Sequence, residues 1–311
     1  MALRWAAILL SVVATGCASA PPPAPAVPVD RLIEDVRILS ADDMEGRAPD
    51  TPGSARARAY ILQRFEEIGL QPVRRDFEQE FIFTRKGGPV HGVNLIGRIE
   101  GTSRSRKALL VMAHYDHMGV VDGEVFNGAD DNASGVAALL AVAQAFIERP
   151  PRHDVIFAVV DAEEGGMRGA RIVVADPPIP LDQIVMAVNF DMLSKSAKGE
   201  LYAAGAAHFP WLKPRLEALA AAAPVTLKLG HDTPAWGEGQ DWTMESDHGA
   251  FHERQVPWVY FGVEDHPEYH QPTDDFATVP QDFFRRSAAT VTAAVRMLDD
   301  DLDAIAREAG R

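Results

Sequence analysis

Residues 113–132 read AHYDHMGVVDGEVFNGADDN, and this stretch decides the fold. It opens with a cluster of histidines and an aspartate around His114 and ends in an acidic pair that includes Asp131. An apolar run at 108–112 precedes it, and a run with helical spacing at 134–147 follows it. The polar cluster is therefore predicted at the carboxyl end of a buried strand, where open α/β sheets place their functional sites.

Three further apolar runs end in acids or in a histidine. These runs, each with the polar residues that follow it, are 155–160 with Asp161, Glu163 and Glu164, 184–190 with Asp191, and 257–261 with His270 after a turn. Strands that alternate with helical segments favour a mostly parallel sheet. We therefore expect an α/β fold with a single globular domain, in which a mostly parallel central sheet carries helices on both faces.

The remaining elements follow from hydrophobic spacing and capping residues. Helices are expected at 30–39, 54–69, 134–149, 169–175, 211–223 and 283–306, and two strands at 75–83 and 93–99. The folded domain is expected to span residues 30–311. Because 47% of the residues are hydrophobic, this length can bury a large core.

The N-terminus predicts an export signal. Within residues 1–20, one early arginine precedes an apolar run that is too short to span a membrane. The sequence VATGC at 13–17 resembles a bacterial lipoprotein box in which Cys17 is lipidated, and Ala18 after it favours the outer membrane. Ordinary cleavage after Ala20, giving a soluble exported protein, is the alternative. The proline-rich segment 21–29 then predicts an extended linker.

Charge and cysteine content exclude several classes of partner and chemistry. A formal net charge of −15 argues against nucleic acid and anionic lipid as general partners, because both would be repelled. Contact with a membrane is expected only through a lipidated Cys17. Since Cys17 is the only cysteine, the chain has no disulfide and no thiolate ligand or nucleophile in the predicted domain. The sequence leaves the oligomeric state open.

The acids and histidines at the strand ends predict a metal site. Carboxylate oxygens and imidazole nitrogens without sulfur suit zinc, with manganese or cobalt as alternatives. Two metal ions about 3.5–4 Å apart share a bridging carboxylate, so a pair needs a central aspartate with one histidine and one acid on each side. The chain supplies such a set of five: His114, Asp131, Glu164, Asp191 and His270. Glu163 is left free beside it.

Seven short motifs together resemble a known family. They are EGRAP at 45–49, HYD at 114–116, GADDNASG at 128–135, EEG at 163–165, NFDM at 189–192, SDH at 246–248 and YHQP at 269–272. In order and at compatible separations, they look like the signatures of metallopeptidase family twenty-eight. That family holds secreted dizinc aminopeptidases, and its relatives include glutamate carboxypeptidase and glutaminyl cyclase.

The resemblance implies how the five ligands are divided between two divalent ions, for which zinc is the preferred metal. Asp131 would bridge the metals. His114 and Asp191 would complete one site, and Glu164 and His270 the other.

Three supporting roles are expected, the first implied by the resemblance and the other two by nearness to a histidine in the sequence. Glu163 resembles the general base that takes a proton from a water activated by the metals and passes it to the leaving amine. Asp116 would orient the imidazole of His114, and Asp274 would do the same for His270.

The activity implied is that of an exopeptidase that hydrolyses the N-terminal bond of peptides with a free N-terminus. Carboxypeptidase relatives carry extra domains that 311 residues do not accommodate. Cyclase relatives work with one zinc, so the presence of both His114 and Asp191 speaks against a cyclase-like acyltransferase. A non-catalytic binding protein of this fold should have lost ligands or Glu163. No G-x-S-x-G or H-E-x-x-H motif supports another hydrolase design.

Three features remain open at this level. His117 and His248 lie in or beside the motifs without an assigned role. The loop 230–247, which contains Trp236 and Trp242, either forms a pocket wall or anchors itself to the core. The other histidines are interpreted as ordinary structural or surface residues: His91, His153, His208, His231, His252 and His266.

Overall fold

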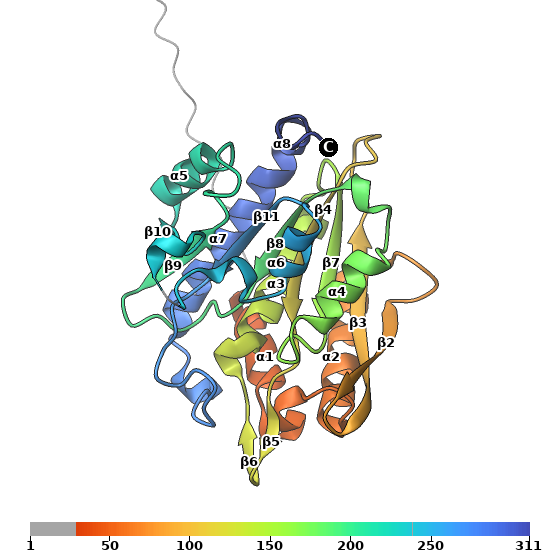
Figure 1. The fold of residues 1–311 in the computed structure, drawn as a ribbon, viewed down its shortest axis with the longest axis vertical. Helices are drawn as coiled ribbons and strands as arrows, with labels where there is room; N and C mark the ends of the chain where they lie inside the picture. The colour runs from red at the N-terminus through yellow and green to blue at the C-terminus, as the bar shows by residue number, and fades with distance from the viewer. Residues whose placement is uncertain (1–28, 238) are drawn as a thin grey trace, which may run out of the picture.

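Alternating side chains on the central strands divide the core into two layers. In β4 (Ala108–His114), Leu109 and Val111 join one hydrophobic cluster, and Leu110 and Met112 join another. Successive side chains of a strand point to opposite faces of the sheet, so a fully buried strand needs cover on both sides. The computed structural model describes residues 29–237 and 239–311 and has this three-layer architecture (Figure 1).

The sheet is parallel at its centre and antiparallel toward its edges. Four mutually parallel strands lie in the order β7 (Asp154–Val160), β4, β8 (Ile184–Phe190) and β11 (Trp258–Gly262). Beyond β7, β3 (Gly88–Ile99) is antiparallel and pairs with β1 (Gln71–Pro72) and β2 (Glu78–Arg85). Beyond β11 come β9 (Glu200–Ala204), antiparallel to it, and β10 (Thr226–Leu229). The predicted α/β fold is confirmed.

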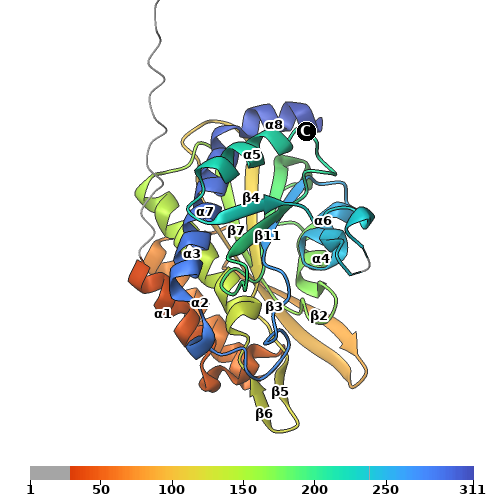
Figure 2. The same cartoon turned by 90° about the vertical axis from the view of Figure 1, so that its left-hand side faces the viewer.

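Helices cover both faces of this sheet, as Figure 2 shows. On one side lie α1 (Val29–Leu39), α2 (Pro52–Ile68), α3 (Gly135–Glu148) and α7 (Gln281–Asp300). On the other side lie α4 (Arg168–Ala175) and α6 (His248–Glu253). Of two more helices, α5 (Lys213–Ala222) packs against β10 and α7, and α8 (Leu302–Ala309) packs against α7 and β8. No helix among the described residues is long and apolar enough to cross a membrane.

Several boundaries differ from the predictions. The helix expected at 283–306 is broken at Asp301, and α8 turns so that Leu302 and Ile305 join the core; no proline or glycine signals this break. Strands β9 and β10 were not predicted. Val29, assigned to the linker, already belongs to α1. The predicted leader and the rest of the linker lie outside the described residues.

The stretch that decides the fold also contains a hairpin. Between its histidine-rich start and its acidic end, β5 (Gly119–Val121) pairs with β6 (Glu124–Phe126) and projects from the body of the domain (Figure 1). The hairpin returns the chain to the end of β4, so that the two polar parts of the stretch meet.

A buried arginine ties this hairpin to the core. The guanidinium of Arg47, which is fully buried, donates to the carbonyl oxygens of Leu39 (2.7 Å), Tyr115 (2.6 Å), Asn127 (2.6 Å) and Gly128 (3.0 Å). Burial lowers the pKa of Arg47 to about 10, so the side chain keeps its charge at neutral pH. One cation therefore holds the end of α1 and both ends of the loop that connects the polar clusters.

Replacing Arg47 should be severely destabilising. Arg47→Met leaves four buried carbonyl groups without their charged donor, and we expect the free energy of unfolding to fall by at least ~3 kcal/mol in urea titrations. The matched control is Arg56→Met, which removes an exposed arginine paired with Glu45 at 2.8 Å and should cost less than ~1 kcal/mol. Equal losses in the two variants would contradict the role of Arg47.

Candidate metal centre

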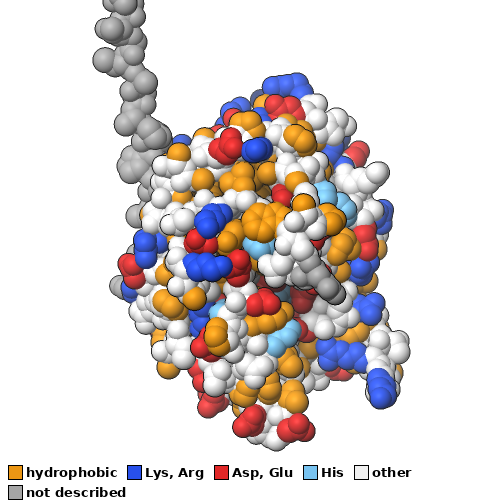
Figure 3. Space-filling view, turned by 60° about the vertical axis from the view of Figure 1, so that its left-hand side comes forward, with side chains coloured by type: hydrophobic (Ala, Val, Ile, Leu, Met, Phe, Trp, Pro, Cys, Tyr) orange, Lys and Arg blue, Asp and Glu red, His pale blue; other side chains and the backbone are white. Residues whose placement is uncertain are grey.

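The carboxyl ends of the parallel strands deliver acids and histidines to one cavity. His114 is the last residue of β4, Asp191 follows β8, and Glu163 and Glu164 follow β7. In Figure 3, acidic and imidazole side chains gather in a hollow of the surface. This cavity has a volume of about 250 Å³ and is lined by His114, Asp131, Glu163, Glu164, Gly166, Met167, Asp191, Met192, Met244, Glu245, Tyr269 and His270. Six of the seven residues predicted as catalytic or metal-binding line this cavity, and Asp116 does not.

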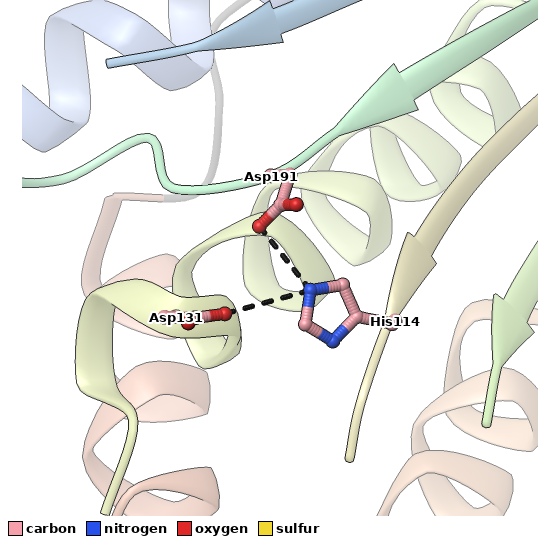
Figure 4. Close-up of side chains that lie close together, drawn as sticks. All are labelled: His114, Asp131 and Asp191. Carbon is pink, nitrogen blue, oxygen red and sulfur yellow. Dashed lines mark hydrogen bonds and ion pairs between the residues drawn. The ribbon is translucent and has the colours of Figure 1, made fainter. Parts of the chain in front are cut away.

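The first group of donors consists of His114, Asp131 and Asp191 (Figure 4). The Nε2 atom of His114 lies 3.2 Å from Oδ1 of Asp191 and 3.5 Å from Oδ1 of Asp131. All three side chains are buried or nearly so. One imidazole and two carboxylates thus converge on a single point.

The second group shares Asp131 with the first. The Nε2 atom of His270 lies 3.1 Å from Oδ2 of Asp131 and 3.4 Å from Oε2 of Glu164. His117 also faces these acids, with its Nδ1 atom 2.7 Å from Oε1 of Glu164 and 3.7 Å from Oδ2 of Asp131, and His117, Asp131 and Glu164 form a set of donors close enough to hold an ion. The sequence left the role of His117 open, although its position three residues after His114 was the available signal.

The two groups fit a pair of metal ions. Zn–N and Zn–O distances of about 2.0–2.2 Å place two ligand atoms of one tetrahedral zinc about 3.3 Å apart. The contacts of His114 and His270 with their carboxylates, from 3.1 to 3.5 Å, match that spacing. Each oxygen of Asp131 faces a different imidazole, as a bridging carboxylate requires. The assignment of these residues as ligands remains a prediction.

Electrostatics at the cavity also favour cations. Burial raises the pKa of Asp131, and the nearby Glu164 carboxylate raises it further. Burial likewise raises the pKa of Glu163 well above its usual range, and Asp247 adds to this rise. Burial opposes the charge on Glu164, but the hydrogen bond from His117 and the neighbouring imidazoles lower its pKa to about 2. The cavity therefore combines Glu164, whose carboxyl group has a lowered pKa, with Glu163, whose carboxyl group has a raised pKa.

Asp131 is held by a buried ion pair on its backbone side. The carboxylate of Asp274 accepts the backbone amides of Asp130 (3.0 Å) and Asp131 (3.0 Å) and pairs with Lys195 at 2.6 Å. The expectation that Asp274 orients His270 was wrong: its oxygens are used by these amides and by Lys195. Asp274 instead shapes the turn that presents the shared carboxylate.

Asp116 faces His114 and also holds the turn after β7. Its carbonyl oxygen, rather than its carboxylate, lies within hydrogen-bond distance of Nδ1 of His114, at 3.1 Å; the carboxylate is 3.7 Å away. That carboxylate accepts the backbone amides of Glu163 (2.9 Å) and Glu164 (3.3 Å). Asp116 therefore links the ends of β4 and β7.

The loop 230–247 both anchors itself and forms a wall. His231 is stacked between Trp236 and Trp242, with ring centroids 4.3 and 3.7 Å apart. Met244 and Glu245, further along, line the metal cavity. The loop therefore does both things that were considered as alternatives. The two tryptophans anchor it, and Met244 and Glu245 form the cavity wall.

His248 does not line the cavity. It is fully buried, and its Nε2 atom lies 2.8 Å from the carbonyl oxygen of Trp242. Burial lowers the pKa of His248 to about 4. Its neighbour Ser246 donates to Oδ2 of Asp191 at 2.7 Å, so the SDH motif supports a predicted ligand through its serine.

Protonation of His248 should destabilise the fold in acid. A histidine with a pKa near 4 when folded and 6.5 when unfolded binds its proton more readily in the unfolded state. Its contribution to stability is therefore present above pH 6.5 and is lost as the pH falls to 4, by roughly 3 kcal/mol. In chelator-treated protein, the difference in unfolding free energy between wild type and His248→Gln should shrink across this window.

The control for this measurement is His91→Gln, since His91 is exposed. Its unfolding free energy should run parallel to that of the wild type from pH 6.5 to 4, the window set by His248. A constant gap between wild type and His248→Gln would contradict a neutral buried imidazole.

This combination of fold and site defines a class of protein. The central sheet with helices on both faces is similar to the fold of a Zn-dependent exopeptidase from Parabacteroides distasonis (TM-score 0.69, 18% identity, 88% and 99% of the two chains). The chain belongs to peptidase family M28, whose family model matches residues 94–295. The resemblance inferred from the motifs is thereby confirmed.

Individual relatives agree with this assignment. The aminopeptidase YwaD of Bacillus subtilis is 28% identical over 197 residues, which cover 60% of this chain and 40% of that protein. Similar solved structures include a leucine aminopeptidase precursor from Bacteroides thetaiotaomicron (TM-score 0.70, 18% identity, 86% and 97% of the two chains). Another is the glutaminyl cyclase of Porphyromonas gingivalis (TM-score 0.70, 17% identity, 88% and 98% of the two chains). The match covers 40% of the length of the first curated relative and 18% of the length of the second, less than half of each.

Proposed function

We propose that the chain is an aminopeptidase that binds two divalent metal ions, zinc first, and hydrolyses the N-terminal bond of peptides. The observation that carries the proposal is the pair of donor groups around Asp131. His114 and Asp191 would complete one site, and Glu164 and His270 the other. The relationship to an aminopeptidase of Bacillus subtilis supports the same activity.

Bound metal ions supply Lewis-acid polarisation of the scissile carbonyl and a water of lowered pKa. Glu163 lies in the cavity beside the ligands without belonging to either donor group. From this position its carboxylate would accept a proton from water and pass it to the leaving amine nitrogen. Asp116 fixes the backbone of Glu163 and so the position of that carboxyl group.

The charge of the cavity favours the N-terminal end of a peptide. Four of its acids are Asp131, Glu163, Glu164 and Asp191, and Glu245 adds another at the rim. Among the lining residues, all within the described part of the chain, none is lysine or arginine. With two metal ions bound, Asp131, Glu164 and Asp191 would be neutralised as ligands, and Glu245 would remain to attract an ammonium group, whereas the lining offers no lysine or arginine to a C-terminal carboxylate. A carboxypeptidase is therefore disfavoured.

Metal dependence and Glu163 can be tested together. The purified chain should contain two zinc-like ions, measured by elemental analysis, and release aminoacyl-anilides in a chelator-sensitive manner. Glu163→Gln should lower kcat by about 10²–10⁴-fold and keep both metals, because it removes the proton acceptor but no ligand. Glu124→Gln, at an exposed acid of β6 outside the cavity, is the matched control and should retain kcat. A metal-loaded Glu163→Gln variant with wild-type kcat would contradict the proposal.

Blocking the two ends of a peptide tests the direction of cleavage. N-acetylation of a short peptide should abolish its hydrolysis, since it removes the ammonium group that the acidic cavity attracts. Amidation of the C-terminus should leave the rate nearly unchanged. Mass spectrometry of the products would show the reverse pattern if the enzyme acted as a carboxypeptidase.

A glutaminyl cyclase is the runner-up, because the cyclase and aminopeptidase structures resemble this fold equally, with a TM-score of 0.70 each. Two complete donor groups favour the two-metal peptidase over the one-zinc chemistry implied for cyclases. Formation of pyroglutamate from an N-terminal glutaminyl peptide, with one metal bound per chain, would select the cyclase. A binding protein without catalysis is disfavoured by Glu163 at the cavity.

We further propose that the chain is exported and anchored through a lipidated Cys17, with residues 21–28 as a spacer. Radiolabelled palmitate should be incorporated by the wild type expressed in a bacterium and not by Cys17→Ser. Absence of label from the wild type would favour ordinary cleavage after Ala20, and equal labelling of both proteins would contradict lipidation at Cys17.

A further inference from the structure

The second donor group contains one side chain more than the first. His117 and His270 both face the carboxylates of Asp131 and Glu164, with ring centroids 5.8 Å apart. The first group has a single imidazole, that of His114. The question is whether His117 is an additional ligand or has another task.

Interatomic distances separate the two roles. Ligand atoms on one zinc are about 3.3 Å apart, and His270 lies 3.1 and 3.4 Å from its carboxylate oxygens. His117 instead approaches Oε1 of Glu164 to 2.7 Å, the length of a charge-assisted hydrogen bond, and stays 3.7 Å from Asp131. The spacing favours a direct hydrogen bond over a shared metal.

The oxygens of Glu164 are divided in the same way as those of Asp191. Oε1 of Glu164 contacts His117, and Oε2 faces His270. Oδ2 of Asp191 accepts from Ser246 at 2.7 Å, and Oδ1 faces His114. Each terminal carboxylate thus has one oxygen held by a side-chain donor and one turned toward a predicted metal position.

The surroundings of His117 restrict its ring to this contact. The side chain is completely buried, whereas that of His270 is 36% exposed. Gly128, with a φ of +54°, packs on the ring: a side chain there would come within 2.6 Å of His117 and collide with the carbonyl oxygen of Asp131. The Nε2 atom of His117 has no hydrogen-bond partner among the described residues. The proton of the neutral ring therefore belongs on Nδ1, where Glu164 accepts it.

We propose that His117 is a positioning residue that donates its Nδ1 proton to Oε1 of Glu164 and thereby limits Glu164 to a single ligand oxygen. This inference rests on the proposed two-metal function. It gives each metal three protein ligands, with Asp131 shared, and leaves further coordination positions free toward the cavity. Sites with three protein ligands are typical of catalytic zinc, whereas four protein ligands are typical of structural zinc.

Two substitutions at one position distinguish a donor from a ligand. His117→Leu removes the hydrogen bond, and His117→Asn keeps an N–H group near the place of Nδ1 but supplies a poor zinc ligand. We expect competition with a chromophoric chelator to show that His117→Leu loses about 10–100-fold in affinity for one of the two ions. His117→Asn should retain most of that affinity and most of kcat.

The matched control is His153→Leu. His153 is also fully buried, and its Nδ1 atom lies 3.1 Å from a carboxylate oxygen of Asp299, away from the cavity. Its loss should lower stability and leave both metal affinities unchanged. An unchanged metal affinity in His117→Leu would overturn the proposal, and so would equal losses in His117→Leu and His117→Asn, which would make His117 a ligand.

A crystal structure of the zinc-loaded wild type gives a test that does not depend on a variant folding. We expect Nδ1 of His117 more than 3 Å from either zinc and within hydrogen-bond distance of Glu164. A Zn–Nδ1 distance of about 2.0–2.1 Å would overturn the inference. Fewer than two zinc ions bound at these residues would instead overturn the proposed function, so the two failures are distinguishable.

Discussion

Mutual repulsion among buried acids is the constraint on which the rest of the site depends. Asp131, Glu163, Glu164 and Asp191 line one cavity whose described lining contains no lysine or arginine. Two unit charges 4 Å apart interact by about 4 kcal/mol at an effective dielectric constant near 20, so such a cluster strains the fold unless cations or protons neutralise it. Burial is the largest cause of the raised pKa values of Asp131 and Glu163, and neighbouring carboxylates raise both further.

The scaffold keeps these acids together through donors placed behind them. The Lys195 and Asp274 pair holds the turn of Asp131 by its backbone amides, and the charged Arg47 fastens the loop before it. The backbone next to the site is unusual as well: Ala162, Met192 and His270 have φ values of 59°, 60° and 53°. Non-glycine residues persist in this region only where the surrounding structure determines their conformation. Stability elsewhere in the fold therefore supports the geometry of the site.

The carboxylate oxygens of the site are divided between the two donor groups and the side chains that hold them. Asp131 turns one oxygen to each donor group, while Glu164 and Asp191 each turn one oxygen inward and have the other held by His117 or Ser246. The proposed two-metal function rests on this arrangement, with Glu163 beside it. Membership in peptidase family M28 is consistent with this arrangement.

Sequence alone determined the parallel centre of the sheet, the family and the five converging residues, because each of these residues lies at the end of an apolar run or inside a motif, and the ends of parallel strands must meet. The sequence did not determine which side chains hold these five residues in place. Asp274 was assigned to His270 from sequence proximity, but it contacts Lys195 and the turn of Asp131. His117 gained a role only because the hairpin after it brings Gly128 and Asp131 back against its ring. Strand periodicity is a local property that the sequence carries, whereas hydrogen-bond partners distant in the chain depend on side-chain packing, which only the tertiary structure decides.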